Sequence, residues 1–272
     1  MRPVVYISSD LNKHYEDGSF LGRIKDRVKI TLEGESFIED LNMNISRVKL
    51  PPNFNKRAYT KNMEIARKYM KGTEVNLAPK TSRIFDYEYL NDFQRRLFAY
   101  SVVNSIKLLL RLKKKSIKNS CIVIYDAAEN INSNIISELA KESRYCVLLS
   151  KNIKKASVLS DYIIANYGVS PIVTNDVKYA LDSADFIITS ESIEVNSKKS
   201  IWYINNMFHP SFMDNAVNDV TYSVPWEMNG LEVPAELLGA ILSQMDQKDI
   251  EASLKYNGVF MDKIKFNNMV KE

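Results

Sequence analysis

The feature that most constrains the fold is a run of alternating apolar strands and amphipathic helices between about residues 119 and 206. The predicted elements are strand 121–125, helix 133–143, strand 146–149, helix 153–167, strand 171–174, helix 176–183, strand 185–189 and strand 201–205. Continuous apolar strands suit a sheet that helices cover on both faces, and this alternation is typical of parallel sheets with crossover connections. The sequence therefore predicts a Rossmann-like α/β unit.

The first third of the chain has a different pattern of predicted strands and helices. Short strands are predicted at 3–8 and 27–32, separated by a loop that contains glycine. Helical spacing follows at 61–70, and a longer helix begins at Asn91 or Asp92, either of which can cap it. We therefore expect a smaller α+β domain at 1–115, followed by a Rossmann-like domain at 116–272.

The last part of the expected Rossmann-like domain consists of C-terminal helices. Apolar residues recur on one helical face from Pro234 to Met245, and a second helix is predicted at 249–256, where Asn257 and Gly258 end it. The predicted fold class is thus α/β, a parallel sheet domain with a smaller N-terminal α+β domain.

Composition excludes several classes of protein. Hydrophobic residues make up 45% and charged residues 26% of the 272, which suits a chain with a packed core. A net charge of +4, with acids spread among the bases, does not favour a nucleic-acid partner. No long apolar run or signal peptide is present, so we expect a cytoplasmic protein with no membrane partner. A closed metal site that uses cysteine needs about four ligands and would therefore take both cysteines and both histidines of the chain, so we expect no metal site.

The turn after the first strand of the α/β unit lacks glycine. Asp126 and Ala128 stand where the first two glycines of a dinucleotide-binding turn would be, and Glu129 adds a second negative charge. Those glycines permit a tight turn and let backbone N–H groups approach the phosphates. Side-chain crowding and charge repulsion therefore both oppose a pyrophosphate at this turn.

Short polar residues occupy the rest of the turn. Asn130, Asn132 and Ser133, with Asn134 after them, either cap the following helix or donate hydrogen bonds to an anion. The sequence leaves both interpretations open.

The residues after the second strand favour NADP over NAD. Ser150, Lys151 and Lys154 are the polar and basic types that receive a 2′-phosphate, whereas an NAD-binding domain places an acid there. The stretch 150–159 also resembles the shikimate dehydrogenase and glutamyl-tRNA reductase group, whose second strand runs into Asn-Arg-Thr-x-x-Lys-Ala-x-x-Leu. The resemblance extends through 179–189 and ends on Thr189, which it implies as a further cofactor contact.

The same resemblance implies a catalytic pair. Shikimate dehydrogenases use a lysine from an Asn-Val-Thr-x-Pro-x-Lys stretch and an aspartate from an Asn-Thr-Asp-Gly stretch. The nearest sequences here are Val75-Asn-Leu-Ala-Pro-Lys80 and Leu90-Asn-Asp92, so Lys80 and Asp92 become the catalytic candidates. A surface lysine and a helix cap are the structural alternatives for these two residues.

Two functions remain open at this point. The glycine-free turn favours a dehydrogenase relative that has lost conventional dinucleotide binding and that binds a small-molecule ligand or a protein partner. Ser150 and Lys151 favour the alternative, an NADP-dependent oxidoreductase of the shikimate dehydrogenase type that acts on a small hydroxy or keto acid. The sequence does not decide whether the protein is an enzyme or whether it forms a homodimer.

Overall fold

A computed structural model of the chain describes residues 1–69, 74–195, 199–267 and 269–271. The chain divides into two compact units. Unit 1 comprises Met1–Leu97 and Thr221–Asp262, and unit 2 comprises Phe98–Val220 and Lys263–Glu272. These units are defined by contacts in space. The expected domains 1–115 and 116–272 are defined by the pattern of predicted helices and strands along the sequence, and they remain a proposal.

Unit 1 contains a mixed four-stranded sheet of order β2-β3-β1-β4. β1 runs parallel to β3 and β4, and β2 pairs antiparallel with β3 at the edge. Its elements are β1 Val4–Ser9, a 3-10 turn Leu11–Lys13, α1 Phe20–Lys29, β2 Thr31–Ile38, a 3-10 turn Glu39–Leu41, β3 Met43–Leu50, α2 Lys56–Arg67, β4 Asn76–Lys80, α3 Arg83–Asp86, β12 Val233–Pro234, α8 Ala235–Leu242 and α9 Ile250–Tyr256.

Helices cover both faces of this sheet. α2 packs against β1 and β3, and α8 packs against β1 and β4. Side chains of the two central strands are fully buried between them, among them Val4, Val5, Ile7 and Ile45. Burial of this kind, at roughly 25 cal/mol per Å² of apolar surface, is the main force that holds the unit together.

Unit 2 contains the predicted parallel sheet, and the α/β fold class is confirmed. Six strands run parallel in the order β10-β9-β8-β5-β6-β7. Its elements are a 3-10 turn Ile117–Asn119, β5 Cys121–Tyr125, α5 Asn132–Glu142, β6 Tyr145–Leu149, α6 Ile153–Tyr167, β7 Ile172–Thr174, α7 Val177–Ser183, β8 Phe186–Thr189, β9 Ser200–Tyr203, β10 Ala216–Val217 and β14 Met269–Lys271. The chain passes between the units in α4 Asp92–Leu112, β11 Asp219–Ser223 and β13 Phe260–Phe266.

The order of strands in unit 2 defines a topological switch point. From β5 the chain moves outward through β6 and β7, and then it returns to the other side of β5 for β8 and β9. In such doubly wound sheets, ligands bind outside the carboxyl ends of the strands at this switch point. The residues that follow β5 and β8 are therefore the first place to look for a site.

The prediction of a strand at 27–32 is wrong. α1 continues to Lys29, and only then does β2 begin at Thr31. The Ser19 hydroxyl caps α1 by accepting a hydrogen bond from the Gly22 N–H at 2.9 Å. The alternation of Val28 and Ile30 arose because the end of a helix runs directly into the start of a strand.

Other boundaries also differ from the sequence predictions. α2 begins at Lys56, where Asn55 caps it, earlier than the predicted 61–70, and residue 70 lies outside the described residues. After the two predicted C-terminal helices, the chain continues in β13 and β14, which pair antiparallel through Ile264 and Lys271. The C-terminal part is therefore helical and then extended.

Candidate functional site

The switch point of unit 2 is formed by the carboxyl ends of β5 and β8. Tyr125, the last residue of β5, lies in register with Thr189 of β8 and with Leu149 of β6. The polar residues that follow these three strands consequently meet at one edge of the sheet.

The turn after β5 adopts a backbone conformation that glycine usually supplies. Asp126 has φ of 55°, in the left-handed region, which aspartate tolerates better than most residues. The Glu129 and Asn132 N–H groups donate to the Asp126 and Glu129 carbonyls, each at 3.0 Å, and the Ser133 N–H donates to the Asn130 carbonyl at 3.2 Å. These N–H groups donate to carbonyls within the turn, so fewer of them are free to bind a phosphate.

Carboxylates face each other at the same edge. Burial raises the pKa of Glu191, which follows β8, and the charge and hydrogen bond of Asp126 raise it further. Lys151 lowers the pKa of Glu191 and Glu129 raises it, so both charges lie close to this carboxyl. The site thus concentrates negative charge where a dinucleotide would place its own.

The polar residues of the turn do not cap α5. Its N-cap position is Ile131, with no side-chain capping bond, so the capping interpretation of Asn130, Asn132 and Ser133 is wrong. Asn132 is fully buried and donates its amide to the Asp126 carbonyl at 2.9 Å, which fastens the turn. The Asn130 side-chain oxygen accepts from Lys155 at 3.0 Å, and Ser133 is exposed.

Two of the predicted cofactor residues shape turns, and two are exposed to solvent. The Ser150 hydroxyl is buried and accepts from the Asn152 N–H at 3.0 Å. Thr189 is fully buried, where its hydroxyl donates to the Glu191 carbonyl and accepts from the Glu191 N–H. Lys151 and Lys154 are exposed beside the start of α6.

The structure does not bring Lys80 and Asp92 together. Lys80 ends β4, in register with Ser8 of β1. Asp92 instead lines a surface groove with Asn76, the first residue of β4. At the usual rise per residue of a strand, Asn76 and Lys80 lie about 13 Å apart along β4. Asp92 is 79% exposed and pairs with Arg96 at 2.9 Å.

Asn91, the residue before Asp92, makes the cap of α4. The Gln94 N–H donates to the Asn91 side chain and the Asn91 N–H donates to the Gln94 side chain, each at 2.9 Å. This reciprocal pair is a capping box, so Asp92 has no capping role.

A buried polar cluster that the sequence analysis missed lies directly after Lys80. Asp86 accepts hydrogen bonds from the Thr81 N–H at 2.7 Å, the Thr81 hydroxyl at 2.8 Å and the Tyr59 hydroxyl. Burial raises the pKa of Asp86 to about 7, while these donors act in the opposite direction. A carboxyl with such a pKa can exchange a proton near neutral pH, which is what acid and base chemistry requires.

The same cluster holds a buried ion pair. The Arg83 guanidinium meets the Glu236 carboxylate at 3.0 Å, and the two side chains are only 5% and 2% exposed. The Gln94 amide donates to the Glu236 carbonyl at 3.0 Å. In the sequence, Arg83 and Glu236 are 153 residues apart, so no local pattern signals the pair.

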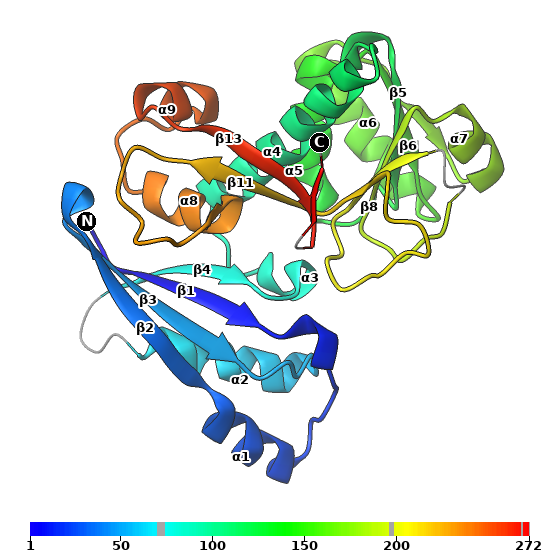
Figure 1. Cartoon of the computed structure of the whole chain (residues 1–272). Coiled ribbons are helices and arrows are strands. Elements are labelled where there is room, and N and C mark those ends of the chain that lie inside the picture. Colours follow the sequence, from blue (N-terminus) through cyan, green and yellow to red (C-terminus); the bar gives the residue numbers. More distant parts are fainter. Residues whose placement is uncertain (70–73, 196–198, 268, 272) are drawn as a thin grey trace. The chain divides into compact units, whose positions relative to one another are not determined.

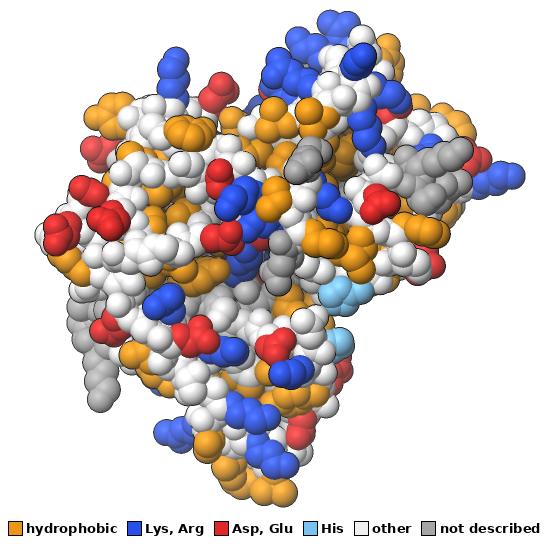
Figure 2. Space-filling model, viewed as in Figure 1, with side chains coloured by type: hydrophobic (Ala, Val, Ile, Leu, Met, Phe, Trp, Pro, Cys, Tyr) orange, Lys and Arg blue, Asp and Glu red, His pale blue; other side chains and the backbone are white. Residues whose placement is uncertain are grey.

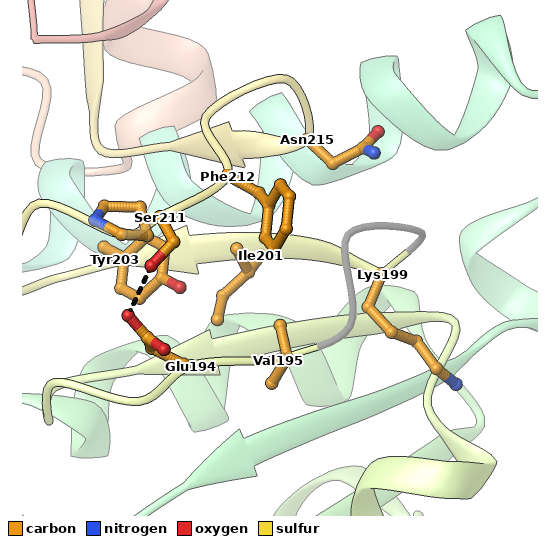
Figure 3. A pocket seen from close by; sticks show the side chains of 9 residues that line it. Glu194, Val195, Lys199, Ile201, Tyr203, Ser211, Phe212 and Asn215 are labelled. Carbon is orange, nitrogen blue, oxygen red and sulfur yellow. Dashed lines mark hydrogen bonds between the residues drawn. The ribbon is translucent and has the colours of Figure 1, made fainter.

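Unit 2 also contains a small pocket beside β9 (Figure 3). It encloses about 80 Å³, and Tyr203 and Phe212 supply part of its apolar wall. The Ser211 hydroxyl donates to Glu194 at 2.7 Å, while Lys199 points away from the other labelled side chains. Burial, followed by the charge of Glu194, raises the pKa of Tyr203 to about 12. The volume is enough for a few waters or a small polar group, and too small for a dinucleotide.

The described residues contain no group of three or more His, Cys, Asp or Glu side chains that could hold a metal ion. In the same part of the chain, no helix has the length and apolar character that crossing a bilayer requires.

No protein-family model matches the chain, and a comparison with curated protein sequences finds no match. Solved structures do show similarity. A shikimate dehydrogenase in complex with NADP+ has a TM-score of 0.37 and 14% identity, over 75% of this chain and 76% of that one. A quinate dehydrogenase from Corynebacterium glutamicum in complex with NAD has a TM-score of 0.36 and 10% identity, over 75% and 79%. An ornithine transcarbamoylase from Giardia lamblia has a TM-score of 0.40 and 10% identity, over 93% and 85%.

The class of protein follows from the geometry described above. The chain is an α/β protein whose unit 2 has a Rossmann-like, doubly wound parallel sheet. Solved structures similar to it include NAD- and NADP-bound dehydrogenases of the shikimate and quinate type. At these identities and scores, a function has to be argued from the residues themselves.

Proposed function

We propose that unit 2 is a dehydrogenase-related module that has lost conventional NAD(P) binding and that binds another small-molecule ligand or a protein partner. The observation that carries this proposal is the meeting of Asp126 and Glu191 at the carboxyl ends of β5 and β8. A pyrophosphate placed at this turn would bring its negative charges next to both carboxyls.

The expected repulsion between these carboxylates and a pyrophosphate is larger than the attraction that the N-terminus of α5 exerts on an anion. Two like charges about 4 Å apart near a protein surface repel by about 4 kcal/mol. The N-terminus of α5 attracts an anion by about 0.3 to 1 kcal/mol, or up to about 2 kcal/mol when partly buried. The turn's own hydrogen bonds also occupy the Glu129, Asn132 and Ser133 N–H groups. The balance opposes a dinucleotide in its usual position.

A specific observation supports the alternative, an NADP-dependent oxidoreductase of the shikimate dehydrogenase type. Lys151 and Lys154 are exposed after β6, where a 2′-phosphate would find positive charge. In that case the cofactor would supply the hydride chemistry and the protein would orient it. Lys80 and Asp92 would remain the catalytic candidates, so Lys80→Met and Asp92→Asn should each lower the rate of hydride transfer.

Calorimetric titration with NADP(H) and NAD(H) separates the two functions. The proposal expects no heat of binding and no thermal shift with either cofactor at millimolar concentration, whereas a ligand at 100 times its dissociation constant would stabilise by about 2.7 kcal/mol. Binding of NADP by the wild-type chain, weakened by Lys151→Ala, would establish the alternative instead.

A double variant tests whether the charges of Asp126 and Glu191 prevent dinucleotide binding. Asp126→Gly with Glu191→Gln removes both charges and relieves the left-handed backbone, so it should gain at least about tenfold in affinity for NAD(P). Asp161→Asn, on the exposed surface of α6, removes a charge elsewhere in unit 2 and should gain nothing. Equal affinities for the three proteins would refute the electrostatic argument.

A further inference from the structure

The helix α1 of unit 1 exposes its apolar side and buries its polar side. Phe20 and Leu21 are each 68% exposed, Ile24 is 49% exposed and Val28 is 78% exposed. The buried residues of α1 are Gly22 and Asp26. A surface helix of a globular protein normally turns the other way, with its apolar stripe toward the core.

Polar contacts hold α1 in this orientation. The Asp26 carboxylate accepts hydrogen bonds from the Tyr15 hydroxyl at 2.6 Å, the Asn53 amide at 2.7 Å and the Asn62 amide at 3.3 Å. Gly22 allows the close approach, since a Cβ there would lie 2.4 Å from the Asp17 side chain. The outward apolar stripe is therefore built into the fold.

Cations flank the apolar stripe on both sides. At about 100° per residue, Arg23 and Arg27 lie along one side of the stripe, and Lys25 and Lys29 lie along the other. In the part of the chain that the structure describes, none of the four forms an ion pair with a carboxylate. Asp26, the one acid of α1, is buried and turned inward. Lys25 interacts electrostatically with the Asp17 carboxylate and Lys29 lies over the Tyr15 ring. The outward face thus combines apolar side chains with flanking cations.

Figure 2 shows the same combination. Hydrophobic side chains gather at the lower end of the view, where Figure 1 places α1, and Lys and Arg side chains lie close by. α1 packs beside α2 and lies at the lower end of the view in Figure 1.

We propose that α1 is an interfacial helix that docks unit 1 onto an anionic lipid surface. An apolar stripe with Phe and Leu, bordered by Lys and Arg, is the pattern of helices that lie in the headgroup region with their apolar face buried by about 5 to 10 Å. Anionic lipids attract such cations, and the apolar side chains enter the acyl boundary. This inference departs from the sequence prediction of no membrane partner, which depended on the lack of a long apolar run.

Charge decides against a second copy of the chain as the occupant. A twofold interface would set the same patch against itself, so the four cations of one α1 would face the four of the other. The four side chains also offer only a few hundred Å², below the roughly 800 Å² per partner that a stable interface buries. An anionic surface meets neither objection.

Vesicle sedimentation with the full chain is the first test. The wild-type protein should bind vesicles of phosphatidylcholine with about one third phosphatidylserine at least about tenfold more tightly than vesicles of phosphatidylcholine alone. Added salt should weaken that binding because it screens the attraction. No binding to the anionic vesicles would overturn the proposal.

Substitutions on the exposed stripe test the role of α1. Ile24→Glu and Val28→Glu should each lower vesicle binding at least about tenfold, and their exposure means that thermal unfolding should stay unchanged. Tyr256→Glu is the matched control, because Tyr256 is 85% exposed on α9 of the same unit and should leave binding unchanged. An equal loss in all three variants would assign the binding to charge alone and contradict the proposal.

Two further measurements distinguish a lipid surface from a second copy of the chain or an acidic protein as the partner of α1. Phe20→Trp should shift its fluorescence to the blue with anionic vesicles, and no shift would refute insertion of the stripe. Sedimentation velocity should show that the wild-type chain does not self-associate through α1, and a dimer that Ile24→Glu dissociates would replace the membrane with a second copy. Binding to an acidic protein in the absence of vesicle binding would likewise overturn the lipid assignment.

Discussion

Replacing Asp86 by asparagine should remove a pH dependence of stability that we expect of the wild-type chain near neutral pH. In the folded state, burial raises the pKa of Asp86 from 3.8 to about 7. A group whose pKa rises on folding stabilises the fold fully below its unfolded pKa, and this contribution is lost as the pH rises through the folded value. The wild-type protein should therefore lose stability between about pH 5 and pH 7 through this one carboxyl.

The size of the loss follows from the pKa. Each unit of pH between the unfolded and the folded pKa changes the free energy of unfolding by about 1.4 kcal/mol. From pH 5 to pH 7, the loss amounts to about 2 kcal/mol, because the carboxyl is half titrated at pH 7 and the slope is smaller there. Asparagine keeps the shape but cannot ionise. Its oxygen can accept from the Thr81 N–H, and its amide N–H then faces the Tyr59 hydroxyl, which can rotate to accept.

Urea unfolding at a series of pH values, followed by circular dichroism, measures the difference between the Asp86→Asn variant and the wild type. Subtraction cancels the titration of every other group. Asp92→Asn is the control, because Asp92 is exposed and an exposed ion pair contributes little. Parallel pH profiles for the wild type and Asp86→Asn would refute the reasoning.

Three further predictions concern packing and burial. Arg83→Met and Glu236→Gln should each lower the free energy of unfolding by about 3 to 5 kcal/mol, because each leaves a buried charge without its partner. The double variant should recover much of that loss, and purely additive effects would contradict the buried pair. Gly239→Ala should lose about 1 to 3 kcal/mol, because its new methyl group would lie 2.9 Å from the Gln94 Cα; an unchanged melting temperature would count against this. Burial raises the pKa of the Cys146 thiol to about 12, so a thiol reagent should label it only after unfolding, and rapid labelling of the native chain would disprove its burial.

The alternating elements of unit 2 could be predicted from the sequence because each signal there is local. Strands buried on both faces are continuous apolar runs, and the helices carry their own start and stop residues. Asn152 and Asp176 cap α6 and α7 through their side chains, and Gly168 ends α6 with φ of 68°. Such signals depend on a few neighbouring residues and can be recognised without knowledge of the fold.

The fold of unit 1 was harder to predict because its decisive contacts are remote. The sequence predicts a strand at 27–32 instead of α1, and periodicity alone cannot show that the core takes Asp26 and leaves Val28 outside. The candidate site shows the same limit. The missing glycine at Asp126 is visible in the sequence, whereas its partner Glu191 is brought there only by the pairing of β5 with β8.

The path of the chain through unit 1 limits how this protein can be divided. Arg83, near the end of the first segment, pairs with the carboxylate of Glu236 from a second segment, which begins only after residues 98–220 of unit 2. A fragment that stops at Leu97 would lack both that carboxylate and α8, which packs against β4. We therefore expect that unit 1 does not fold as an N-terminal fragment, because residues 98–220 of unit 2 separate its two segments, and the chain then returns to unit 2 at residue 263.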